Sequence, residues 1–280
     1  MNPIKRLIGT VLTKAPRLGA SFLHEPVFIV GSGRSGTTYL QSLLETHPDI
    51  VGYPGEANEL WHVATYPYHE KQPDVSPIWL DPEQFTSFSL KSWPLGWKQH
   101  IKGRFGTYFR FSHKKVFLQK TVMNNFMLGE MLEMYPKAKF IYLVRNGWSV
   151  ALSYQKKELE KYEHPIYRKY IDLDDLKRVR QIHAQYWNDT VMRVEEDKHM
   201  LFNENNFLEI RYEEFVAKPD HTVQRILKFI GLRDSQDPVF RTAIAGVTDK
   251  NYKARTELDP EELADLEEIM SPALRLKGYI

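Results

Sequence analysis

Residues 28–41 read FIVGSGRSGTTYLQ. Three apolar residues lead into a glycine-rich turn, and the pattern then predicts a helix whose leucines at positions 40, 43 and 44 share one face. This is the layout of a phosphate-binding loop between a strand and a helix, where backbone N–H groups converge on an anion. Loops that bind nucleoside triphosphates with Mg²⁺ place a lysine after the second glycine. This chain has Thr37 and Thr38 there and carries its cation inside the loop, at Arg34.

The rest of the chain alternates strand and helix patterns, which predicts a single α/β domain over residues 26–280. We expect a P-loop-like, mostly parallel sheet with helices on both faces. Strands are expected at 27–30, 116–118, 139–144 and 207–212, and ligands of such sheets bind where the strands end. An aromatic-rich, proline-rich stretch over 52–115 interrupts the alternation, and we interpret it as an insertion that binds the acceptor.

Bulk properties exclude several classes of protein. The 280 residues carry a formal net charge of +2, so no global charge favours nucleic acid, and no nucleic-acid partner is expected. There is no cysteine, which excludes disulfides and thiolate chemistry and favours a reducing cytoplasm. Residues 1–25 form a basic leader without a signal-peptide core. We expect the leader to pack on the domain, with attachment to a membrane surface as the alternative. The oligomeric state is left open.

A second candidate anion site follows the most apolar predicted strand. The run FIYLV ends in Arg145, and Ser149 and Ser153 follow it on the next predicted helix. A Mg²⁺-dependent nucleotide hydrolase needs an acidic residue at such a strand end to hold the metal. An arginine with two serines indicates an anion site instead. Two anion sites at two strand ends predict a nucleotide with phosphates at two separate positions.

These residues resemble a known family, the sulfotransferases that use 3′-phosphoadenosine-5′-phosphosulfate (PAPS). GSGRSGTT at 31–38 is similar to their loop for the 5′-phosphosulfate, and YLVRNGWSVALSY at 142–154 is similar to their 3′-phosphate motif. QKT at 119–121 and NYKARTELDPEELADLEEIM at 251–270 recur in broadly similar form. The Arg-Ser-Gly-Thr-Thr loop resembles that of bacterial, tyrosylprotein and carbohydrate-modifying members.

The resemblance implies a role for each matched residue. PAPS would be the co-substrate, 3′,5′-ADP (PAP) the product, and no metal would take part. Arg34 would stabilise the leaving phosphate, Lys120 would contact the sulfuryl group, and Tyr212 would contact adenine. Cofactor-binding roles fall to the loop residues, the strand-end pair and a basic lid: Gly33, Arg34, Ser35, Gly36, Thr37, Thr38, Arg145, Ser153, Lys253 and Arg255.

The general base and the acceptor are less tightly specified. Glu56, just past the first helix, is our candidate base, and Glu59 is the rival. From Gln84 to Gly129 the chain has no acidic residue but many lysines, arginines and aromatic residues. We therefore expect a small-molecule or saccharide acceptor, such as a carbohydrate or glycolipid. The alternatives are a P-loop small-molecule kinase and a non-catalytic nucleotide-binding module.

Overall fold

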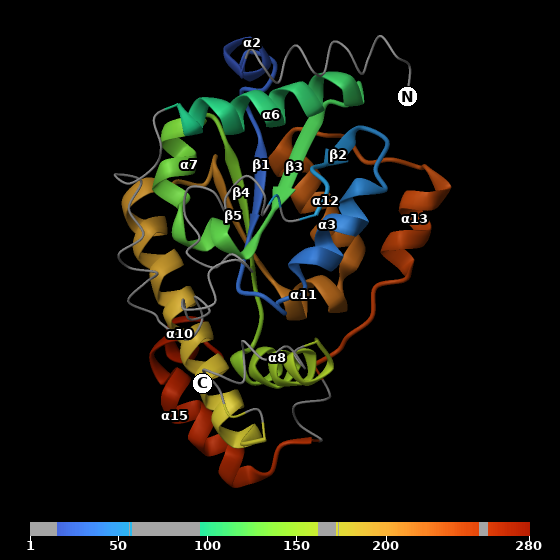
Figure 1. The fold of residues 1–280 in the computed structure, drawn as a ribbon. Coiled ribbons are helices and arrows are strands. Elements are labelled where there is room, and N and C mark those ends of the chain that lie inside the picture. The colour runs from blue at the N-terminus through green and yellow to red at the C-terminus, as the bar shows by residue number, and fades with distance from the viewer. Residues whose placement is uncertain (1–15, 56, 58–95, 162–171, 173, 252–256) are drawn as a thin grey trace.

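The computed structural model describes residues 16–55, 57, 96–161, 172, 174–251 and 257–280. Its centre is a sheet of five strands in the order β2-β3-β1-β4-β5, every adjacent pair being parallel (Figure 1). The prediction of a parallel α/β sheet with a phosphate-binding-loop layout is confirmed. The strands are β1 (Val27–Val30), β2 (Ile50–Gly52), β3 (Val116–Lys120), β4 (Lys139–Val144) and β5 (Phe207–Arg211).

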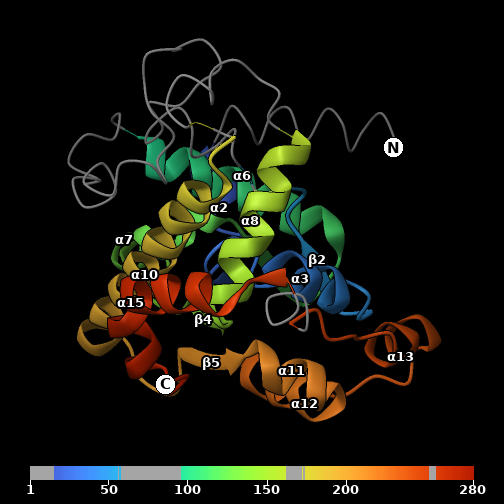
Figure 2. The ribbon, with the colours of Figure 1, turned by 90° about the horizontal axis from the view of Figure 1, so that it is seen from below.

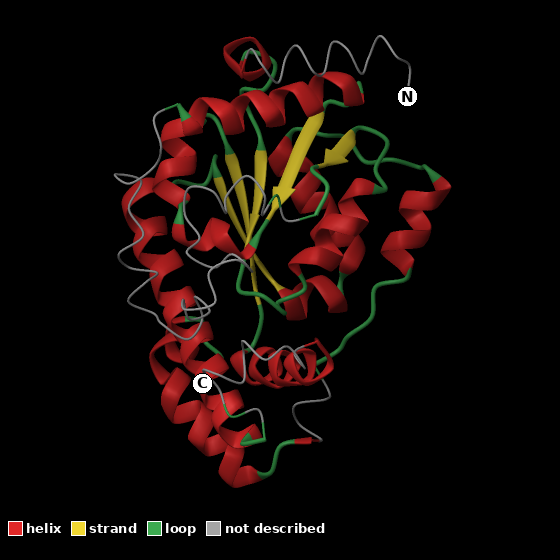
Figure 3. Ribbon diagram, viewed as in Figure 1, coloured by secondary structure: helices red, strands yellow, loops and turns green. Residues whose placement is uncertain are grey.

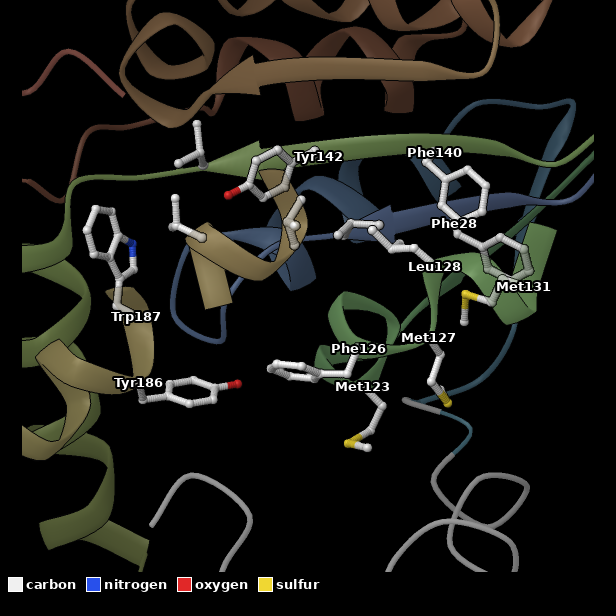
Figure 4. Close-up of a cluster of buried hydrophobic side chains, with 14 of the residues drawn as sticks. Phe28, Met123, Phe126, Met127, Leu128, Met131, Phe140, Tyr142, Tyr186 and Trp187 are labelled. Carbon is white, nitrogen blue, oxygen red and sulfur yellow. The ribbon is translucent and has the colours of Figure 1, made fainter. Parts of the chain in front are cut away.

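Helices cover both faces of the sheet (Figure 3), so the strands read as continuous apolar runs rather than as alternating ones. Val27 and Ile29 point to one face, where they join a buried cluster with helices α3 (Thr37–Glu45), α12 (Pro219–Ile230) and α13 (Pro238–Ala245). Phe28 and Phe140 point to the other face, with α7 (Leu128–Met134), α10 (Leu176–Leu201) and α15 (Pro260–Leu276) (Figure 4).

Two further helices lie at the two ends of the strands rather than on the faces of the sheet. Helix α6 (Trp97–Ser112) runs along the edge where the strands begin and packs on the short helix α2 (Pro16–Ala20) (Figure 1). Helix α8 (Gly147–Lys161) lies at the edge where the strands end (Figure 2). The 3-10 helix η3 (Val122–Phe126) follows β3 directly. The carboxyl ends of the strands therefore face α8, which follows β4 through Arg145 and Asn146.

The structure differs from the sequence-based expectation at several elements, including α6, a regular helix within the stretch 52–115 that was expected to interrupt the alternation. The short strand β2 was not predicted, because three residues carry too little periodicity to recognise. Strand β5 ends at Arg211, and Tyr212 opens helix α11 (Tyr212–Ala217) instead of closing the strand. Helix α10, with 26 residues, was also missed. Among the described residues, no helix is both long and apolar enough to cross a bilayer.

Candidate functional site

The glycine-rich loop between β1 and α3 holds a left-handed backbone at two places. Gly36, which precedes α3, has a φ of 95°, and Arg34 has a φ of 66°. Asn125 of η3 braces the start of the loop: its side-chain oxygen accepts from the Gly31 N–H at 2.8 Å, and its amide donates to the Gly31 carbonyl at 3.0 Å. The loop is thus tied to the segment that follows β3.

The first cavity, of about 560 Å³, opens at the end of the loop. This is a usual size for a small-molecule site. Arg34 from the loop, Arg145 from the end of β4 and Tyr212 from the start of α11 all line it. The structure therefore brings the two predicted anion sites together around one cavity. Its other lining residues come from α3, α8 and the segment after α13: Gly36, Thr37, Thr38, Tyr39, Ser149, Leu152, Ser153, Lys156, Gly246, Thr248 and Lys250.

Arg145 is held in place from several sides although it is only 6% exposed. Its guanidinium lies 4.3 Å from the centre of the Tyr212 ring, a cation–π contact. One terminal nitrogen donates to the Arg34 carbonyl at 3.0 Å, and Nε donates to Asn251 Oδ1 at 2.8 Å. Burial lowers the pKa of Arg145, and the Glu213 carboxylate is among the groups that counteract this. Arginine has a high enough pKa to stay charged in such a site.

The first turns of α8 add polar groups and a further cation to the same cavity. The Ser153 hydroxyl accepts a hydrogen bond from Arg34 Nε at 3.1 Å, which links the loop to the helix. Lys156, three residues later, also lines the cavity and forms an ion pair with Glu257. Sequence reasoning missed Lys156, although the i, i+3 spacing from Ser153 places both side chains on one helix face.

A second cavity, of about 450 Å³, adjoins the first, and Thr38 lines both. Lys120, the last residue of β3 and 3% exposed, lies on its wall. Glu45, the last residue of α3, also lines it and accepts a hydrogen bond from Gln41 at 2.6 Å. Burial and the nearby Glu45 raise the pKa of Tyr108, another lining residue.

Several predicted site residues lie outside the described part of the chain: Glu56, its rival Glu59, Lys253 and Arg255. Two of the predicted loop residues, Ser35 and Gly33, face the protein with the side chain or with the position that a side chain would take. Ser35 is 1% exposed, with its hydroxyl 2.8 Å from that of Ser32. A Cβ at Gly33 would fall 1.8 Å from the Tyr154 hydroxyl. Their part in ligand binding stays a prediction that rests on their backbone N–H groups.

In the part of the basic stretch that the structure describes, from residue 96 to β3, most residues line neither cavity. Lys98 forms an ion pair with Glu133 of α7 at 2.7 Å, and Lys102 lies over the Tyr135 ring. Both belong to α6, at the edge where the strands begin (Figure 1). Tyr108 of α6 does reach the second cavity, where its hydroxyl donates to the Gly52 carbonyl at 3.0 Å.

The sequence matches a family model described as "Sulfotransferase family" over residues 26–237. A similar curated protein is the omega-hydroxy-beta-dihydromenaquinone-9 sulfotransferase Stf3 of Mycobacterium tuberculosis, 24% identical over 91% of this chain and 75% of its own. The protein-tyrosine sulfotransferase of Drosophila melanogaster is also 24% identical, over 73% of this chain and 37% of its own.

Solved structures share the fold. Sulfotransferase STF9 from Mycobacterium avium aligns with a TM-score of 0.62 and 12% identity, over 96% of this chain and 81% of its own. Mouse sulfotransferase SULT7A1, solved in complex with PAP, aligns with a TM-score of 0.53 and 16% identity, over 94% of this chain and 89% of its own. At these identities the likeness concerns the architecture.

Proposed function

The chain belongs to the sulfotransferase family, and from this membership we propose that it transfers the sulfuryl group of PAPS to an acceptor hydroxyl. The observation that carries the proposal is the joint position of Arg34 and Arg145, which follow two adjacent parallel strands and line one cavity. A ligand with one anionic group at each arginine fits such a cavity. PAPS carries charge at both its 5′ and its 3′ positions.

In this proposal the chain itself supplies the positive charge for the reaction. The acceptor oxygen attacks sulfur in line, the bond from sulfur to the bridging oxygen breaks, and its electron pair leaves with PAP. Arg34 and the N–H groups at the start of α3 stabilise the charge that grows on the leaving phosphate. Lys120, on the wall of the second cavity, contacts the sulfuryl oxygens. Tyr212 stacks on adenine, and Lys253 and Arg255 cover the 3′-phosphate.

A general base must take the acceptor proton, and we propose Glu56, with Glu59 as its rival. The described chain reaches the second cavity at Gly55, the residue before Glu56. The second cavity thus provides the acceptor side, with Thr38 at the junction. Two relatives named above act on a hydroxylated menaquinone and on tyrosine, according to their names. A hydroxyl is therefore the acceptor group we propose ahead of an amine.

The far end of the second cavity indicates what else the acceptor carries. Glu45 closes α3, although a carboxylate at a helix C-terminus is electrostatically unfavourable. Gly52 leaves room for it, since a Cβ there would lie 1.6 Å from Glu45 Oε1. Thr38 and Glu45 are separated along α3 by about 10 Å at the rise of a helix. We propose an acceptor with an ammonium or further hydroxyls at about that distance from the sulfated hydroxyl, as in a saccharide.

Thermal-shift titration tests the donor site. Stabilisation by 3′,5′-ADP, and none by ATP with Mg²⁺, is the expected result. The reverse pattern would indicate a kinase and refute the proposal. Transfer of ³⁵S from labelled PAPS to a panel of alcohols, saccharides and phenols then separates an enzyme from a non-catalytic binding protein. Glu56→Gln should abolish most of that transfer while leaving 3′,5′-ADP binding intact.

A further inference from the structure

Behind Arg145, a network of hydrogen bonds converges on one carboxylate, that of Glu213 in α11. Its Oε1 accepts from the Asn146 backbone at 3.2 Å and from the Asn146 side chain at 3.0 Å. The same oxygen accepts from the Asn251 amide at 3.0 Å. Its Oε2 accepts from the Tyr279 hydroxyl, near the C-terminus, at 3.0 Å. Glu213 thus joins three segments that are far apart in the sequence.

The chemistry of the network fixes the orientation of Asn251. Its side chain lies between the Arg145 guanidinium, which can only donate, and the Glu213 carboxylate, which can only accept. The amide oxygen must therefore face Arg145, and the amide nitrogen must face Glu213. Without an acceptor at Glu213, the Asn251 amide nitrogen would lose this partner, and the side chain would be held less firmly against the guanidinium.

The same carboxylate holds the backbone from which Arg145 projects. Asn146 follows Arg145 and precedes α8, and its Oδ1 accepts from the Ser149 N–H at 2.9 Å. Glu213 contacts both the backbone and the side chain of Asn146, so it also fixes the start of α8. Arg145, Ser149 and Ser153 therefore depend on Glu213 for their relative positions.

We propose that Glu213 is a positioning residue for the 3′-phosphate of the donor, an inference that rests on the proposed function. It acts through hydrogen bonds rather than through its charge, because a negative charge behind the site would repel a phosphate. Glu213 fixes the side-chain positions of Asn251 and Asn146. These two residues in turn hold the Arg145 guanidinium against the Tyr212 ring. The carboxylate itself contacts no part of the donor.

The test compares two ligands that differ only at the 3′ position, 3′,5′-ADP and 5′-AMP, by isothermal titration calorimetry on the full chain. The wild type should bind 3′,5′-ADP more tightly. Glu213→Ala should weaken 3′,5′-ADP about tenfold, the factor that corresponds to one lost hydrogen bond. Binding of 5′-AMP should change by less than about twofold. Glu213→Gln should keep most of the preference, since its amide oxygen can still accept and its nitrogen can donate to Tyr279.

Glu214→Ala is the matched control. The neighbouring carboxylate of Glu214 pairs with Arg225 of α12 rather than with the network, so both affinities should stay as in the wild type. If Glu213→Ala keeps the full preference for 3′,5′-ADP, the positioning role is refuted. An equal loss for both ligands would refute it too, because it would indicate a general structural role. A wild type without any preference would instead contradict the proposed function.

Discussion

Replacing Gly36 by alanine should disturb the donor site through two separable effects. Gly36 has a φ of 95°, and a left-handed backbone costs a residue with a Cβ about 1–2 kcal/mol. The new methyl would also lie 3.0 Å from Cδ2 and 3.1 Å from Cε2 of Tyr212. Overpacking of this kind costs about 1–3 kcal/mol. The free energy of unfolding should therefore fall by about 2–5 kcal/mol.

Gly231 provides the control that isolates the second effect. It closes α12 with a φ of 80°, and a Cβ there would have no neighbour within 4 Å. In Gly231→Ala the free energy of unfolding should therefore fall only by the cost of the left-handed backbone, about 1–2 kcal/mol. Urea denaturation measures both losses, and calorimetry measures the affinity for 3′,5′-ADP. Because the Tyr212 ring also carries Arg145, only Gly36→Ala should weaken that affinity. Equal unfolding losses together with equal affinities would refute the reasoning.

Three further predictions concern catalysis, the acceptor and stability. Arg34→Met should lower kcat by about a hundredfold and raise KM for PAPS by a smaller factor, because the leaving-group charge grows in the transition state; an equal effect on both would contradict this role. Glu45→Lys should reverse the order of KM between tyramine, which carries an ammonium, and 4-hydroxyphenylacetate, which carries a carboxylate; an unchanged order would exclude Glu45 from the acceptor site. Lys277→Met should cost about 3–5 kcal/mol of unfolding free energy, since Lys277 lies 2.5 Å from Glu195 and 2.8 Å from Glu209 in buried surroundings. Burial alone would raise the pKa of Glu209, but Lys277 and Lys198 outweigh it and hold the pKa below its usual value. The stability that Glu209 gains is therefore present above its unfolded-state pKa and is lost as the pH falls through its folded-state pKa. The difference between wild type and variant should thus stay constant from about pH 7 down to about pH 5 and narrow below about pH 4.5. Urea denaturation extended to about pH 3 would show a constant difference if the reasoning is wrong.

Local patterns predicted four of the five strands and the helix α3 that follows the first of them. The apolar runs at 27–30 and 139–144 match β1 and β4 residue for residue, since strands buried on both faces have an unmistakable composition. Pro219 and Gly231 correctly marked the two ends of α12. The arginine and serines after β4 were recognisable because strand ends and helix starts have defined positions in such folds.

No local sequence pattern predicted the residues that hold the site in place. Asn125 lies 94 residues from Gly31, and Glu213 lies 66 residues from Tyr279. Hydrogen bonds between such distant residues form only in the folded sheet, so neither periodicity nor spacing in the sequence predicts them. The second cavity was equally hidden, because it forms where α3, the end of β2 and α6 meet. Glu45 in particular reads as an ordinary surface carboxylate until Gly52 is seen beside it.

The brace between Asn125 and Gly31 bears on how tightly the donor can bind. Asn125 is fully buried and occupies both the N–H and the carbonyl of the glycine at the start of the loop. Fixing the backbone of one residue costs about 1–2 kcal/mol in conformational entropy. Because the brace forms when the chain folds, this ordering cost falls on folding rather than on the proposed binding of a nucleotide.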